Sequence, residues 1–308
     1  MGLENKLKMG LGVLALAGGI SYSNNLKAQE FERPYGYIED QDPALRTAVL
    51  GVNVLGSGLL AGIVGAAEGR NFFEDFGKGA FGGTLQYIGM EISMYDAPGL
   101  AILGKFTTET GASMVENTVA GRGLADRLHY GLGPGLIEIN TTEETQEEHG
   151  SFNLYWRLLP VIGLAYNIEE RNKFDFLNSF LYMTPIFINK PEIKVSGGVT
   201  TTSWGLTTGN IINSYPKHPS NLKHEFVHSL QYERFRIGQE VVRIVVPGPV
   251  DWLEENLHLR IGEDFTRIMF DGPQTVCGWA EKSRGCSRRW WMPTEVEARL
   301  METASEEK

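Results

Sequence analysis

The sequence predicts an α+β fold with a glycine-rich helical N-terminal segment, a central antiparallel sheet and a helical, zincin-like C-terminal part. Three observations lead to this prediction. Residues 44–125 are rich in glycine and apolar residues, residues 131–213 carry aromatic and β-branched runs separated by turn signals, and a helical pattern returns after Ser220. The chain has 308 residues and is 42% hydrophobic, which is enough for a large buried core.

Residues 1–29 have the layout of a secretory signal peptide. Lys6 and Lys8 precede an uncharged stretch at 9–20, and the polar segment that follows ends in alanine and glutamine. The uncharged stretch is too short to span a bilayer comfortably, so cleavage is favoured over anchoring. The alternative is an amphipathic first helix that stays attached. We expect an exported protein, in the periplasm, in the cell envelope or outside the cell.

Residues 30–130 are predicted to form the glycine-rich helical segment. Within it, residues 47–67 run for 21 positions without a charge, which meets the length criterion for a membrane span. The spacing from Gly58 to Gly62 is typical of helices whose backbones approach closely. Two interpretations stay open: a pair of helices packed in a soluble core, or a membrane-associated hairpin. In both, we expect residues 47–67 to pack against residues 79–83 and not to cross a bilayer alone.

Residues 131–308 are predicted to contain the sheet followed by the zincin-like domain. The expected strands of the sheet lie within four segments: 135–142, 152–168, 174–189 and 197–213. The acidic run at 143–149 is predicted to be a solvated loop between the first two of them. Helices are expected from Ser220 to about Phe235, at 249–270 and after Pro293.

The net charge restricts the partners that the protein can bind, and the two cysteines bear on the compartment in which it is found. A net charge of −10 argues against a nucleic-acid partner, because phosphate binding requires a basic face. The two cysteines, Cys277 and Cys286, are expected to form a local disulfide in an exported chain, and the alternative is two free thiols. One basic cluster is expected to pair with carboxylates of the chain, or else to favour an acidic substrate; it consists of Lys282, Arg284, Arg288 and Arg289.

The stretch NLKHEFVHSLQYERF, residues 221–235, carries the candidate chemistry. In a helix, His224 and His228 lie one turn apart on the same face, so that both imidazoles can reach one ion. Two neutral imidazoles at this spacing bind Zn²⁺, and Glu225 is placed to accept a proton from a water on the ion. The alternative is an ordinary helix that happens to carry polar residues.

The motif HEFVHSLQ at 224–231, followed by EVEA at 295–298, resembles the gluzincin clan of zinc metallopeptidases. The match covers two short motifs. The resemblance implies a peptide or protein substrate, with His224, His228 and Glu295 as zinc ligands and Glu225 as the catalytic base.

Two neighbours of Glu295 bear on this assignment. With Thr294 as the N-cap, Glu297 is expected to cap its own helix from the third helical position, which favours Glu295 as the ligand. The alternative has Pro293 at the first helical position, which shifts the cap to Met292 and leaves Glu297 free to bind the ion. Arg299 stands where the family has an aspartate that orients a zinc-bound histidine. Orientation of that histidine must therefore come from another residue.

His258 is the candidate for a residue near the oxyanion, where gluzincins often place a histidine, a tyrosine or an arginine. His218 and Tyr232 are further candidates, and ordinary packing is the alternative for all three. A rival interpretation of the whole chain is a non-catalytic, membrane-associated structural protein. In that case the glycine-rich hairpin is the functional part, and HEFVH binds a metal for structure or not at all.

Overall fold

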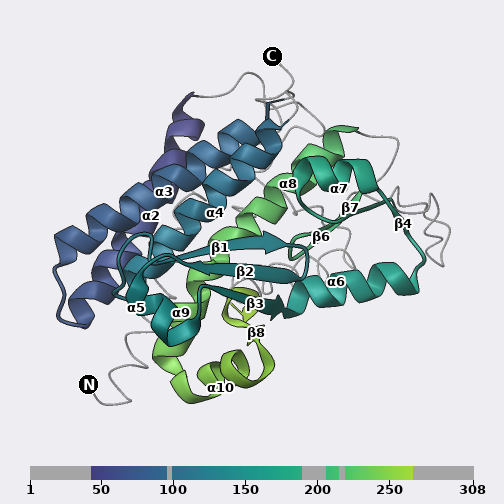
Figure 1. The fold of residues 1–308 in the computed structure, drawn as a ribbon. Coiled ribbons are helices and arrows are strands. Elements are labelled where there is room, and N and C mark those ends of the chain that lie inside the picture. Colours follow the sequence, from purple (N-terminus) through teal and green to yellow (C-terminus); the bar gives the residue numbers. More distant parts are fainter. Residues whose placement is uncertain (1–42, 96–98, 189–205, 215–218, 266–308) are drawn as a thin grey trace, which may run out of the picture.

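The computed structural model describes residues 43–95, 99–188, 206–214 and 219–265, and their arrangement is a mixed α+β fold. Three long helices come first, two four-stranded sheets follow, and further helices end the described part (Figure 1). The predicted fold class is therefore confirmed. The predicted signal peptide at residues 1–29, both cysteines, the basic cluster and the helix expected after Pro293 lie outside the described residues.

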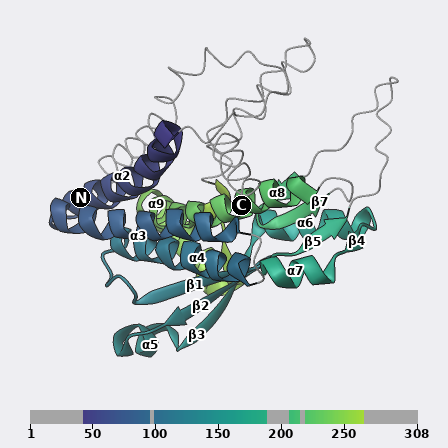
Figure 2. The same cartoon turned by 90° about the horizontal axis from the view of Figure 1, so that it is seen from above.

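Helices α2 (Pro43–Ala67), α3 (Phe72–Ser93) and α4 (Leu100–Val119) lie side by side as one layer (Figure 2). Their close approach depends on glycine. A Cβ added to Gly79 would lie 2.6 Å from the Cβ of Ala61, and one added to Gly83 would lie 2.3 Å from the carbonyl oxygen of Asn53. The predicted packing of residues 47–67 against residues 79–83 is confirmed.

Among the described residues, α2 is the one helix that is long and apolar enough to cross a membrane. The stretch concerned is Val49–Ala67, and 33% of it is buried against the rest of the protein. Length and composition alone do not separate a core helix of a soluble protein from a membrane-associated helix, so both interpretations of this segment stay open.

The first sheet has the strand order β1-β2-β3-β8. Strands β1 (Arg127–Leu132), β2 (Gly135–Asn140) and β3 (Phe152–Arg157) are antiparallel, and β8 (Leu259–Arg260) pairs parallel to β3. The acidic run is a helix, α5 (Glu143–His149), and not the predicted loop. Thr142 caps it by accepting a hydrogen bond from the Thr145 N–H, and acidic residues in its first turn interact favourably with the helix dipole.

The second sheet has the strand order β4-β5-β7-β6, so the prediction of one antiparallel sheet is wrong. Its strands are β4 (Lys173–Phe174), β5 (Ile186–Ile188), β6 (Leu206–Thr208) and β7 (Ile211–Ser214). Strands β5 and β7 run parallel, whereas the β4–β5 and β6–β7 pairs are antiparallel. Both sheets are therefore small and mixed.

Two of the segments predicted as strands contain helices, α6 (Leu158–Glu169) and α7 (Phe176–Tyr182). In α6 the buried positions are Pro160, Gly163 and Asn167, which follow a helical period. A short uncharged apolar run does not distinguish a strand from a helix by composition alone. For α7, Asp175 acts as the N-cap and accepts from the Asn178 N–H.

The first sheet buries its polar side and exposes apolar side chains. One row of paired residues, His129, Glu138 and Asn153, faces inward, and two of its members are almost fully buried. Along β3 the outward residues Phe152 and Trp156 are 60% and 47% exposed. The strands cross in front of α8 in Figure 1, and His129 and Glu138 form a buried ion pair on the inward side of the sheet.

The C-terminal helices are α8 (Pro219–Arg234), a 3₁₀ turn η3 (Phe235–Ile237), α9 (Gly238–Val245) and α10 (Pro247–Leu257). The helix predicted to reach about Phe235 is confirmed. The helix predicted at 249–270 is interrupted after α10, because His258 adopts a left-handed conformation at φ 48° and the chain enters β8. Residues 262–265 are helical again, and 266–270 lie outside the described residues. The predicted boundary at residue 131 falls inside β1.

Candidate functional site

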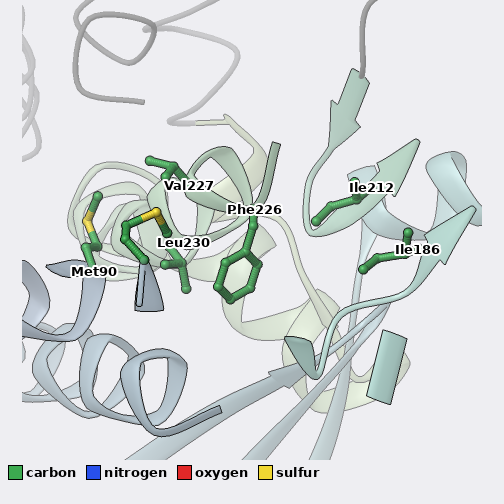
Figure 3. Close-up of a cluster of buried hydrophobic side chains, with 7 residues drawn as sticks. Met90, Ile186, Ile212, Phe226, Val227 and Leu230 are labelled. Atoms are coloured by element: carbon green, nitrogen blue, oxygen red, sulfur yellow. The ribbon is translucent and has the colours of Figure 1, made fainter. Parts of the chain in front are cut away.

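Helix α8 carries the HEFVH motif and is held by an apolar face. Phe226, Val227 and Leu230 are fully buried, and Figure 3 shows them beside Ile186 and Ile212 of the second sheet. Met90 of α3 belongs to the same cluster. This apolar face packs α8 against both the glycine-rich helices and the second sheet.

His228 is oriented by a residue one turn further along the helix. Its Nδ1 lies 2.8 Å from Oε1 of Gln231, and both side chains are buried. An amide oxygen only accepts, so a hydrogen bond between these two atoms requires the proton on Nδ1. The lone pair of the neutral ring is then on Nε2, the nitrogen through which such a histidine binds metal. Gln231 thus orients the imidazole ring of His228.

Glu225 is held by a strand far from it in the sequence. The Thr207 hydroxyl on β6 donates to Glu225 Oε2 at 2.6 Å, and the exposed fraction of Glu225 is 6%. The sequence does not indicate Thr207 as part of the site, because the residue lies 18 positions upstream in another element. Only the packing of β6 beside α8 brings the two together.

The predicted ligand set falls only partly within the described residues. His224 lies in α8, four residues before His228, and Glu295 lies outside the described residues together with Glu297 and Arg299. Among the described side chains, no group of three or more His, Cys, Asp or Glu residues could hold a metal ion. That set does not include the side chain of His224 or Glu295, so the zinc ligands stay a prediction.

The structure ties His258 to the first sheet. Its carbonyl oxygen accepts a 2.7 Å hydrogen bond from the Trp156 N–H, and its ring centroid lies 6.1 Å from that of Tyr155. Glu225, in contrast, contacts the second sheet. These contacts explain His258 as the residue that ends α10 and starts β8, and its role near an oxyanion stays a prediction.

Of the other oxyanion candidates, His218 lies outside the described residues and Tyr232 is buried. The Tyr232 hydroxyl donates to Asp264 Oδ1 at 2.5 Å, and the guanidinium of Arg157 stacks on the ring at 5.1 Å from its centroid. Burial and the neighbouring carboxylates of Glu263 and Asp264 raise the pKa of Tyr232 well above 10. The phenol is therefore held neutral inside the protein.

A buried ionic network adjoins the motif helix, and the sequence did not reveal it. Glu233 of α8 contacts Arg157 at 2.7 Å and Arg236 at 2.6 Å, and Lys105 of α4 lies 3.7 Å away. Burial alone would raise the pKa of Glu233, but these three cations outweigh it and hold the pKa far below 4.5. The network joins α8 to α4 and to the first sheet.

A second group of this network lies deeper under the first sheet. His129 is 3.1 Å from Glu116 and 2.8 Å from Glu138, and Arg260 of β8 is 2.6 Å from Glu116. Burial raises the pKa of Glu263, which shares Arg157 and Arg260 with the other carboxylates. Every charge here has a partner of opposite sign, as buried charges require.

Comparison with protein-family models, with curated protein sequences and with solved structures finds no match for this chain. The resemblance to gluzincins therefore rests on the two motifs. The local geometry of α8 adds to it an oriented histidine and a hydrogen-bonded glutamate, both buried.

Proposed function

We propose that the protein is an exported zinc-dependent metallopeptidase. The observation that carries the proposal is the buried contact of 2.8 Å between His228 Nδ1 and Gln231 Oε1, because an imidazole that donates through Nδ1 can bind a metal through Nε2. His224, His228 and Glu295 would hold the ion. When bound, zinc would lower the pKa of a coordinated water toward neutrality and polarise a carbonyl group.

The chain itself would move the proton. Glu225 would accept a proton from the attacking water on one of its carboxylate oxygens and deliver it to the leaving amide nitrogen. Thr207, which donates a hydrogen bond to Glu225, would keep the carboxylate in one orientation. Removal of a general base of this kind typically slows a reaction by about 10² to 10⁴.

The position of β6 suggests how a peptide would bind. Among the described strands it is the last in the order β4-β5-β7-β6, and it packs beside α8. An extended peptide that added to this edge of the sheet would make main-chain hydrogen bonds and pass close to Glu225. Main-chain hydrogen bonds do not depend on the side chains of the bound peptide, so peptides of many sequences could bind, as a peptidase requires.

The test compares native protein with Glu225→Gln on a broad set of peptide substrates. We expect hydrolysis to fall by about 10² to 10⁴ while the zinc content is unchanged, because glutamine keeps the size and polarity of the side chain but not its basicity. Glu255→Gln, at an exposed position on α10, is the matched control and should leave hydrolysis as it is. Equal activity in native protein and Glu225→Gln would contradict the proposal.

A second candidate function is a non-catalytic, membrane-associated protein whose glycine-rich helices are the functional part. It is supported by the apolar stretch of α2, whose length and composition would allow it to cross a membrane. In that case native protein should not hydrolyse any of the peptides. Carbonate extraction should also retain the protein in the membrane pellet if α2 is a true span.

A further inference from the structure

We propose that Thr207 is a positioning residue, which holds the Glu225 carboxylate in the orientation in which it accepts a proton. The inference rests on the proposed function. Its basis is the contact of 2.6 Å between Thr207 Oγ1 and Glu225 Oε2, made where both side chains are nearly dry, with exposed fractions of 9% and 6%.

The hydroxyl has one proton and two acceptors within reach. Thr207 Oγ1 lies 3.0 Å from the backbone oxygen of Glu225 and 2.6 Å from the carboxylate oxygen. A contact of 2.6 Å is typical of an O–H donor on a charged oxygen, whereas 3.0 Å is long for a hydroxyl. The proton is therefore assigned to the carboxylate.

This bond restricts a side chain that otherwise turns about three torsions. Glu225 is on α8 and Thr207 is on β6, so the bond fixes the carboxylate relative to the sheet as well as to its own helix. A catalytic group that is held in one orientation reacts faster than one that samples several. The hydroxyl does not touch the reacting atoms and acts only through Glu225.

The adjacent residue provides a matched control. Thr208 belongs to the same strand, and its Cβ lies beside Gly163 of α6. Successive strand residues point to opposite faces, so Thr207 faces α8 while Thr208 faces α6. The same substitution, threonine to valine, can therefore be made on either side of β6.

The kinetic experiment uses the full chain with zinc and compares Thr207→Val, Thr207→Ser and Thr208→Val. We expect kcat to fall about 10- to 100-fold in Thr207→Val, the effect of losing a hydrogen bond to a charged group, with KM and zinc content nearly unchanged. Serine keeps the hydroxyl and should restore kcat to within a few-fold of the native value. Thr208→Val should leave kcat as it is.

A second readout does not depend on activity. The carboxyl ¹³C resonance of Glu225 is identified by its loss in Glu225→Gln and is recorded at one fixed pH without zinc. We expect it to shift in Thr207→Val and to return in Thr207→Ser. A purely structural role of Thr207 would lower the thermal stability in both variants without this pattern.

The outcomes separate this inference from the proposed function. If Glu225→Gln abolishes hydrolysis but Thr207→Val keeps the native kcat, or if serine does not restore it, the positioning role is wrong and the proposed function stands. If native protein and Glu225→Gln hydrolyse peptides equally, or neither does, the proposed function is wrong and the positioning role is overturned with it.

Discussion

At the scale of single residues, the candidate site depends on two hydrogen bonds that turn the HEFVH pattern into oriented groups. Gln231 Oε1 lies against Nδ1 of His228, and the Thr207 hydroxyl donates to the carboxylate of Glu225. Both bonds are buried, so water does not compete for them. A helix with the same motif but without these partners would hold its histidine and glutamate less firmly.

Replacing Gln231 tests the first of these bonds. We expect Gln231→Leu to weaken zinc binding about 10- to 100-fold, because the imidazole of His228 loses the acceptor that fixes its tautomer. The measurement is a competition with a chelator of known affinity. Gln231→Glu keeps an acceptor at the same place and should retain zinc at least as well as native protein. Equal weakening in both variants would show that packing, not the acceptor, matters.

At the scale of helices and strands, glycine determines how closely α2 and α3 approach. Positions on α3 that face α2 have no room for a side chain, whereas Gly77 on the same helix has no atom within 4 Å of an added Cβ. Substitution by alanine is therefore predicted to have opposite effects on stability at a glycine packed against α2 and at Gly77.

We expect Gly83→Ala to lower the free energy of unfolding by about 1–3 kcal/mol, because the methyl group would clash with the backbone of α2. Gly77→Ala should raise it by about 0.5–1 kcal/mol, since alanine loses less conformational entropy in a helix. Urea unfolding of the two variants checks both signs. Destabilisation by Gly77→Ala as large as that by Gly83→Ala would contradict the described packing of α2 on α3.

At the scale of the whole molecule, the interior between α4, the first sheet and α8 is ionic, and this makes stability depend on pH. The pKa values of Glu138 and Glu233 lie well below 4.5 in the folded protein. Burial alone would raise each pKa, but His129 and Asn153 outweigh it at Glu138, and Arg157 and Lys105 outweigh it at Glu233. Glu109 and Glu263 have raised pKa values, mainly because of burial.

The two kinds of carboxylate act in opposite directions as the pH falls. A group with a depressed folded pKa stabilises the fold above its unfolded pKa and loses this contribution as the pH falls toward the folded pKa. A group with a raised folded pKa takes up its proton earlier in the folded state, which adds stability as the pH falls to its unfolded value. The pKa values of Glu116 and Glu240 are lowered as well, so the depressed carboxylates of this interior outnumber the raised ones. We therefore expect the free energy of unfolding to fall below about pH 4.5.

Glu138→Gln tests this dependence, since the amide keeps hydrogen-bonding groups but has no proton to bind. Urea unfolding between pH 5 and 3 should show a shallower slope than native protein, by up to about 1.4 kcal/mol per pH unit, the value for one proton. The exposed Glu255 provides the control, and Glu255→Gln should leave the slope unchanged. An unchanged slope in Glu138→Gln would show that this carboxyl does not contribute.

Local patterns sufficed for the glycine-packed helices, for the motif helix and for its apolar face. Each of these depends on neighbours within one or two turns: the spacing of glycines in α2, the period of Phe226, Val227 and Leu230, and the two histidines four residues apart. The strand segments were less predictable. Aromatic and β-branched runs occur both in strands and in short helices. The helical burial period favours a helix at α6, and the Asp175 N-cap favours one at α7.

The sequence by itself determined the fold class, the position of α8 and the candidate roles of His228 and Glu225. Only the tertiary structure decided that the strands divide into two mixed sheets, that Thr207 holds Glu225, and that the first sheet buries charges and exposes Phe152 and Trp156. The reason is the separation along the chain of the residues that interact. Helix faces follow from the chain's own period, whereas strand partners and buried ion pairs join residues far apart in the chain, and no local pattern records which ones will meet.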